Sequence, residues 1–220
     1  SGSGGSAGGC ATLGITGDTI TFDGTNDLDK LASTQILTPG AQSQSWSRFG
    51  MTWNDDHLFI AVVSEAFEAD FRPVHIYLEA DTALGTAAGA DGKEYSSLTA
   101  KLPFTPTHLI AVRSKNDGGA GNYNGVYLPA SAWANQSLAL VENADTFLSA
   151  DKHTVSVRVP RQQLGCPTEL RVAVHVVNAV SGNEWKDVVP GTHTPWAAAA
   201  TGYYELSLKS NPPTANWQLK

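Results

Sequence analysis

This 220-residue chain lacks both a long apolar run and an excess of positive charge. A membrane-spanning helix needs about 20 consecutive apolar residues, and no part of the sequence comes near that length. The formal net charge is −7 at pH 7, whereas nucleic acids and anionic membrane surfaces attract basic proteins. We therefore expect neither a membrane span nor a nucleic-acid partner.

Recognisable catalytic motifs are also missing. The chain has no nucleophile elbow and no zinc-protease helix, and its two cysteines cannot form a cysteine-rich metal site. The histidines are scattered singly. Lysine is scarce, while glycine, serine, threonine, alanine and asparagine are plentiful, which is typical of a secreted β-protein. We predict a non-catalytic protein that is secreted or held at the cell surface.

Two cysteines, Cys10 and Cys166, are present. In an extracellular protein the expected state is one disulfide, and closing so long a loop stabilises a fold by about 4–5 kcal/mol in the chain-entropy model. The alternatives are two free thiols or a lipidated Cys10, because SAGGC ends like a lipobox. Residues 1–14 are predicted to form a flexible Gly/Ser-rich tail or linker.

The clearest strand pattern runs from Arg48 to Glu79. Residues 48–53 alternate, with Phe49, Met51 and Trp53 on one face. After the turn 54–56, the run 58–63 is apolar at every position, which is typical of a strand covered on both faces. A third strand is predicted at 73–80, so we expect the core here.

The rest of the chain predicts an all-β fold with long loops and almost no helix. We expect a two-sheet antiparallel β-sandwich of jelly-roll or immunoglobulin-like type over residues 15–209, followed by a C-terminal tail, 210–220. Asn124-Gly125 predicts a hairpin turn, and Gly165 ends a predicted helical turn. Further strands are predicted at 19–22, 107–114, 137–141, 146–148, 153–160, 169–178 and 202–208.

Carboxylates gather in one Gly/Asn-containing loop, where Asp23 and Asp27 lie close together in sequence. Asp81 follows a predicted strand end. Oxygen ligands of this kind suit a hard cation, so a structural Ca²⁺ is the candidate cofactor and these three residues are its candidate ligands. The alternative is an Asx-rich turn that needs no ion.

Several short motifs occur in a familiar order: Asp23-Gly24, WNDDHLFIA at 53–61, VHIYLE at 74–79 and VPRQQLG at 159–165. Together they resemble the carbohydrate-binding family 9 and DOMON-like superfamily of β-sandwiches, over residues 15–208. The resemblance implies several possible roles. Some members bind sugar chains, often with structural Ca²⁺ and a pair of clamping tryptophans. Others bind haem b, and others are accessory modules of secreted glycosidases or surface proteins.

The favoured hypothesis is a carbohydrate-binding or accessory module of a larger secreted or surface protein. Its expected partners are a glycan and neighbouring domains. Aromatic side chains can stack on the apolar face of a pyranose ring. For each candidate aromatic residue, the alternative role is to pack between a loop and the sandwich. The resemblance favours the two tryptophans of the long loop 179–201. The candidate ligand-binding residues are Trp185, Trp196, Tyr123, Tyr127 and Trp133.

Two alternatives belong to other functional classes. A structural or adhesion domain of a surface assembly would need no small ligand. A haem b electron-transfer domain would use Met51 with His175 as the candidate pair. Met51 fits the core pattern better, so haem is the least favoured of the three hypotheses.

Overall fold

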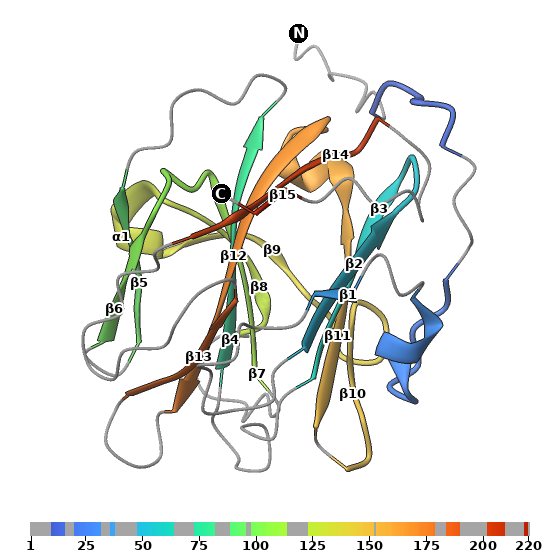
Figure 1. Ribbon diagram of the computed structural model, residues 1–220, viewed down its shortest axis with the longest axis horizontal. Coiled ribbons are helices and arrows are strands. Elements are labelled where there is room, and N and C mark those ends of the chain that lie inside the picture. Colours follow the sequence, from blue (N-terminus) through green and yellow to red (C-terminus); the bar gives the residue numbers. More distant parts are fainter. Residues whose placement is uncertain are drawn as a thin grey trace, which may run out of the picture.

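The computed structural model describes residues 10–15, 20–31, 36–37, 48–63, 73–81, 89–95, 98–113, 123–151, 153–178, 184–189, 202–209 and 218–219. It confirms the all-β prediction, because two antiparallel sheets pack face to face (Figure 1). Helical structure in these residues is limited to short turns. None of the helices described is long and apolar enough to cross a membrane.

The first sheet, on the right of Figure 1, has the strand order β1-β2-β3-β11-β10. The predicted β2–β3 hairpin forms, with Met51 opposite Ile60. Its turn is favoured because the Asn54 side-chain oxygen accepts the backbone N–H of Asp56 at 2.9 Å and of His57 at 2.8 Å. The strands are β1 (Ile36–Leu37), β2 (Arg48–Trp53), β3 (His57–Val63), β10 (Thr146–Leu148) and β11 (Thr154–Pro160).

The second sheet has the order β15-β14-β12-β4-β7-β8-β9, and β13 also pairs with β12. Its centre is the β4–β12 pair, which runs from Val74 opposite Val176 to Asp81 opposite Glu169. The strands are β4 (Pro73–Asp81), β7 (His108–Arg113), β8 (Gly125–Leu128), β9 (Asn135–Ala139), β12 (Glu169–Asn178), β13 (Glu184–Val189), β14 (Tyr204–Ser207) and β15 (Gln218–Leu219).

The main core lies between the two sheets. Phe49, Met51 and Trp53 of β2 belong to the same buried cluster as Ile76 of β4 and Val174 of β12. Each large apolar side chain buried in this way stabilises the fold by about 1.5–3 kcal/mol. Met51 and Trp53 are therefore packing residues, as the alternation in β2 indicates.

Both sheets are also covered on their outer faces, which explains why β3 is apolar from Leu58 to Val63. Over the first sheet, residues 20–31 and the 3-10 turn η1 (Asp27–Lys30) place Phe22 and Leu28 against Phe59. Over the second sheet, the hairpin of β5 (Ala90–Tyr95) and β6 (Leu98–Leu102) and the turn α1 (Ala130–Trp133) cover Tyr77.

Some local predictions were wrong. Residues 20–22 are not in a strand, because they belong to the outer layer rather than to a sheet. Strands β5 and β6 were missed, and β13 lies inside the predicted loop 179–201. Gly125 begins β8, so Asn124-Gly125 is not the hairpin turn. Part of the predicted tail is ordered on the sandwich, because β15 pairs with β14.

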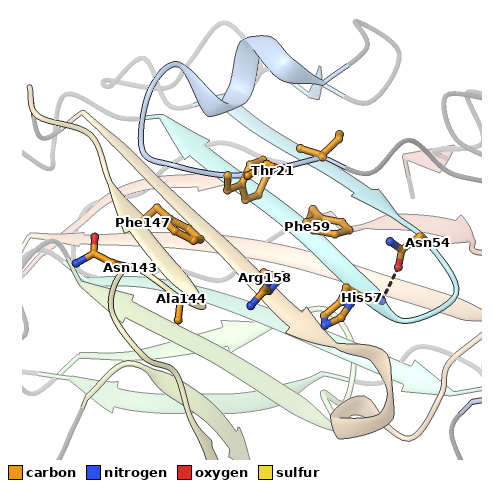
Figure 2. Close-up of a pocket in the computed structure, with 10 residues that line it drawn as sticks. Thr21, Asn54, His57, Phe59, Asn143, Ala144, Phe147 and Arg158 are labelled. Atoms are coloured by element: carbon orange, nitrogen blue, oxygen red, sulfur yellow. Dashed lines mark hydrogen bonds between the residues drawn. The ribbon is translucent and has the colours of Figure 1, made fainter.

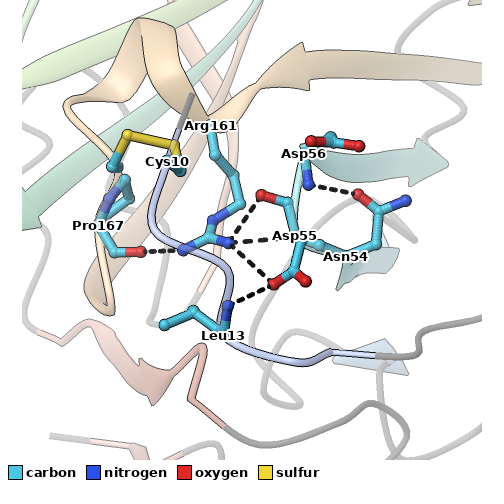
Figure 3. Close-up of a disulfide and its surroundings, with 8 residues drawn as sticks. Cys10, Leu13, Asn54, Asp55, Asp56, Arg161 and Pro167 are labelled. Carbon is cyan, nitrogen blue, oxygen red and sulfur yellow. Dashed lines mark hydrogen bonds and ion pairs between the residues drawn. A yellow bond between two sulfur atoms is a disulfide. The ribbon is translucent and has the colours of Figure 1, made fainter. Parts of the chain in front are cut away.

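The predicted disulfide is confirmed between Cys10 and Cys166, whose Cα atoms lie 5.2 Å apart (Figure 3). Beside it, the 3-10 turn η4 (Arg161–Leu164) ends at Gly165 with a φ of 77°, as predicted. The buried Arg161 side chain donates hydrogen bonds to the carbonyls of Asp55 at 2.9 Å and Pro167 at 2.8 Å. The two sequence motifs at 53–61 and 159–165 are thus joined in space.

Candidate binding site

Three of the predicted ligand-binding aromatics gather on the outer face of the second sheet. Tyr123, Tyr127 and Trp133 belong to the cluster beneath the β5–β6 hairpin. Tyr127 is 7% exposed and Trp133 is 3% exposed. The Tyr127 hydroxyl donates to the Tyr123 carbonyl at 2.7 Å, and Trp133 Nε1 donates to the Asp91 carbonyl at 3.3 Å. The rings of Tyr127 and Trp133 therefore have the packing role that was the alternative to sugar stacking.

Two buried histidines form the base of this cluster. His75 and His175 lie opposite each other on β4 and β12, and both are fully buried. His75 is hydrogen-bonded to the hydroxyls of Tyr77, at 3.2 Å, and Tyr123. Burial lowers the pKa of each histidine from 6.5 to about 3, so both rings are neutral at pH 7.

Lys93 of β5 closes the cluster on its outer side. Its Nζ donates to the Trp133 carbonyl at 2.8 Å and lies 4.7 Å from the centre of the Tyr127 ring. Burial lowers the pKa of Lys93, while the Tyr127 ring face stabilises the cation. These contacts hold the hairpin against the sheet, so the cluster is an interior network rather than an open site.

The haem hypothesis relied on Met51 and His175. Met51 lies in the core between the sheets, whereas His175 belongs to the cluster on the outer face of the second sheet. The two side chains are on opposite sides of that sheet and cannot ligate the same iron.

Asp23 and Asp27 do come together, around a lysine. Lys30 Nζ lies 2.8 Å from the Asp23 carboxylate and 2.7 Å from the buried Asp27 carboxylate. The Asp23 side chain also accepts the backbone N–H of Thr25 at 2.7 Å, which is the Asx-turn arrangement, and the Asp27 carboxylate accepts the N–H of Gly24 at 2.9 Å. Among the described residues, no group of three or more His, Cys, Asp or Glu side chains could hold a metal ion.

Three other candidates cannot be placed as side chains. Asp81 ends β4 opposite Glu169, and Trp185 lies in β13 opposite Val177, but only their backbones are described. Trp196 lies outside the described residues. Their predicted ligand roles stay predictions.

An open pocket of about 520 Å³ lies on the outer face of the first sheet (Figure 2). One wall is the segment 20–22 of the N-terminal layer. The floor is formed by outward-facing residues of β3 and β11, and the opposite wall by residues 143–144 of the turn before β10 and by Phe147 of β10. The lining residues are Ile20, Thr21, Phe22, Asn54, His57, Phe59, Asn143, Ala144, Phe147 and Arg158.

Aromatic rings give this pocket an apolar floor. Phe59 contacts Phe22 edge-to-face, with ring centres 5.9 Å apart, and lies 6.0 Å from the His57 ring. Phe147 contributes a third, half-buried phenylalanine. Phe59 sits directly opposite Arg158 in the β3–β11 pair, and this register brings an aromatic ring and a cation together at the base of the pocket.

The polar groups of the pocket are few. Among the described residues that line it, Arg158 is the one that carries a charge at pH 7. Burial, followed by the nearby charge of Arg158, lowers the pKa of His57 below 6.5, so that His57 is a neutral ring at pH 7. Asn54 and Asn143 add amide groups. An aromatic floor with a small number of polar groups is typical of a small-ligand site.

This pocket was not predicted from the sequence, because its residues come from four distant segments. Two signals were available. Phe59 is a large aromatic at a position of β3 that does not face the main core, and Arg158 lies between Val157 and Val159 in an alternating strand. Neither signal shows which other segments of the chain lie beside these two residues.

Comparison of the chain with known protein families, with curated proteins and with solved structures gives no match. The resemblance to the family 9 and DOMON-like sandwiches therefore stays a prediction.

Proposed function

We propose that this chain is a non-catalytic carbohydrate-binding module of an extracytoplasmic protein, with the pocket on the first sheet as its ligand site. The main support for this proposal is that one open pocket combines aromatic rings with polar groups. The rings are Phe22, Phe59 and Phe147, and the polar groups are Arg158 and two asparagines. A pyranose ring has an apolar face that packs against aromatic rings, and its hydroxyls need hydrogen-bonding groups such as amides and guanidinium.

Two further observations support the proposal. Disulfides persist in oxidising compartments, and the Cys10–Cys166 bond fits a secreted or surface-exposed domain. Glycoside hydrolysis ordinarily needs two carboxyl groups that flank the scissile bond. The described residues that line the pocket include neither aspartate nor glutamate, so binding without hydrolysis is the function this site favours.

Affinity electrophoresis through gels that contain soluble polysaccharides tests the proposal. The panel should include neutral glucans, xylan, mannan and uronic-acid polymers. We expect at least one to retard the protein, and Phe147→Ala to weaken that binding about fivefold to tenfold, because one aromatic contact contributes about 1 kcal/mol.

The matched control is Val141→Ala, since Val141 is 56% exposed and does not line the pocket. This variant should bind as the parent does. The proposal fails if no polysaccharide retards the parent, or if Phe147→Ala binds as tightly as Val141→Ala while both remain folded by circular dichroism.

A further inference from the structure

We infer that the ligand of this pocket carries a carboxylate, so that the preferred glycan contains uronic acid, which meets the Arg158 guanidinium while its ring packs on the phenylalanine floor. This inference rests on the proposed carbohydrate-binding function. It adds a chemical class of sugar, which the aromatic floor alone does not specify.

Arg158 is accessible to a ligand in the pocket. Figure 2 shows its side chain between Phe147 and His57 in the pocket. The side chain is 42% exposed, so a ligand in the pocket can reach it. A sugar ring packed against Phe59 or Phe147 would carry its substituents next to the guanidinium.

The described residues form only weak contacts with the Arg158 guanidinium. Its Nη2 lies 3.5 Å from Asp145 Oδ1, which is beyond the usual length of an N–H···O hydrogen bond. The buried Nε has no hydrogen-bond partner among the described residues. Arg171, by comparison, forms contacts of 2.9 Å with Glu79 and 3.1 Å with Glu205.

Asp145 is held in place by hydrogen bonds to the backbone of Val141. Its Oδ2 accepts the Val141 N–H at 3.1 Å, and its own N–H donates to the Val141 carbonyl at 2.7 Å. These bonds fix Asp145 in the turn before β10, where it cannot easily turn to form a two-bond pair with Arg158. A ligand carboxylate could supply those two bonds, which is the geometry that arginine and carboxylate prefer.

The charges around the pocket are compatible with an anionic ligand. The acidic groups whose charges act on neighbouring His57 are Asp56 and Asp145, and neither lines the pocket. The net charge of −7 belongs to the whole chain. At physiological salt, exposed charges farther away than about 8 Å are largely screened, so local contacts decide the preference.

The test compares each acidic polymer with its own methyl ester. Polygalacturonate, alginate and hyaluronan are the acidic probes, and esterification removes the charge while it keeps the sugar backbone. We expect at least one acid form to bind at least tenfold more tightly than its ester. Arg158→Gln should abolish that difference and retain the weaker binding of the ester.

Lys101→Gln is the matched control, because it removes the same charge from an exposed site on β6, which covers the other sheet. It should retain the full preference for the acid form. Equal binding of acid and ester, or a preference that survives Arg158→Gln, would overturn the uronic-acid inference while the binding-module proposal stands. Absence of binding to every polysaccharide in both panels would overturn both.

Discussion

Arg161 is 1% exposed, and its guanidinium is surrounded by backbone carbonyls rather than by solvent. The Asp55 carboxylate lies 4.0 Å from this guanidinium, and it also accepts the Leu13 N–H at 2.8 Å. One side chain therefore connects the β2–β3 turn, the segment around Cys166 and the N-terminal stretch (Figure 3).

We expect Arg161→Met to lower the free energy of unfolding by about 3 kcal/mol, because several buried carbonyls would lose their donor. Arg161→Lys should recover only part of this loss, since an ammonium group cannot reproduce the fork of a guanidinium. Urea denaturation at equilibrium measures both variants.

The control for this prediction is Arg158→Met, three residues earlier in the chain. Arg158 is partly exposed and has one weak ion pair, so its loss should cost less than about 1 kcal/mol. Similar losses for Arg161→Met and Arg158→Met would show that burial and backbone contacts do not set the contribution of Arg161.

At the scale of elements, the β5–β6 hairpin depends on contacts outside itself. Its two strands pair only with each other within the described structure, and an isolated hairpin is marginally stable in water. The Lys93 N–H donates to the Tyr77 hydroxyl at 2.9 Å. Gly92 permits this approach, because a Cβ there would lie 2.5 Å from the same hydroxyl oxygen.

We expect Gly92→Ala to push the hairpin away from the sheet, since Tyr77 is fully buried and cannot easily move. In hydrogen exchange measured by mass spectrometry, the amides of β5 and β6 should then exchange at least about tenfold faster, while those of β2 and β3 change little.

Gly89→Ala provides a control in the same part of the chain. A Cβ at Gly89 would meet only the Leu102 carbonyl oxygen, at 3.2 Å, so the hairpin should stay in place. The interpretation fails if both alanine variants accelerate exchange in β5 and β6 equally, or if exchange in β2 and β3 rises as much.

For the molecule as a whole, the buried pair His75 and His175 should make the fold sensitive to mild acid. Their pKa in the folded protein is about 3, whereas an unfolded histidine has a pKa of about 6.5. Between these values the unfolded chain binds protons that the folded chain does not, so stability falls as the pH drops below 6.5. The neighbouring Tyr77, Tyr123 and Lys93 supply no negative charge at these pH values.

From pH 7 to pH 5 we expect each of these histidines to contribute a loss of about 2 kcal/mol in the free energy of unfolding. Urea denaturation at the two pH values measures it. In His175→Phe the loss of free energy of unfolding between pH 7 and pH 5 should be about 2 kcal/mol smaller than in the parent. Because each protein is compared with itself at the two pH values, any effect of the substitution that is independent of pH cancels. If the variant and the parent lose the same amount, His175 is not kept neutral by burial.

Sequence patterns could predict those parts of this fold whose causes are local. Strands β2 and β12 were predicted with their exact limits, because their alternation and nearby turn residues lie within each segment. Strand β5 was not, because ADGKEY carries three charged residues and gains its stability from Tyr77 and Trp133, which are distant in sequence.

The candidate site was less predictable than the sheets. The sequence pointed to Tyr127 and Trp133, but it could not show that the β5–β6 hairpin covers them. The pocket depends on the pairing of Phe59 with Arg158 and on the placement of residues 20–22 over the first sheet. Both are long-range contacts that no periodicity within a single segment encodes.

The Cys10–Cys166 disulfide fixes the start of the same N-terminal stretch that supplies one wall of the pocket. If reduction of the bond weakens ligand binding by some factor, ligand binding makes the bond harder to reduce by the same factor. Under the proposed binding function, an attached glycan would then protect the disulfide from thiols, and a reducing environment would favour its release.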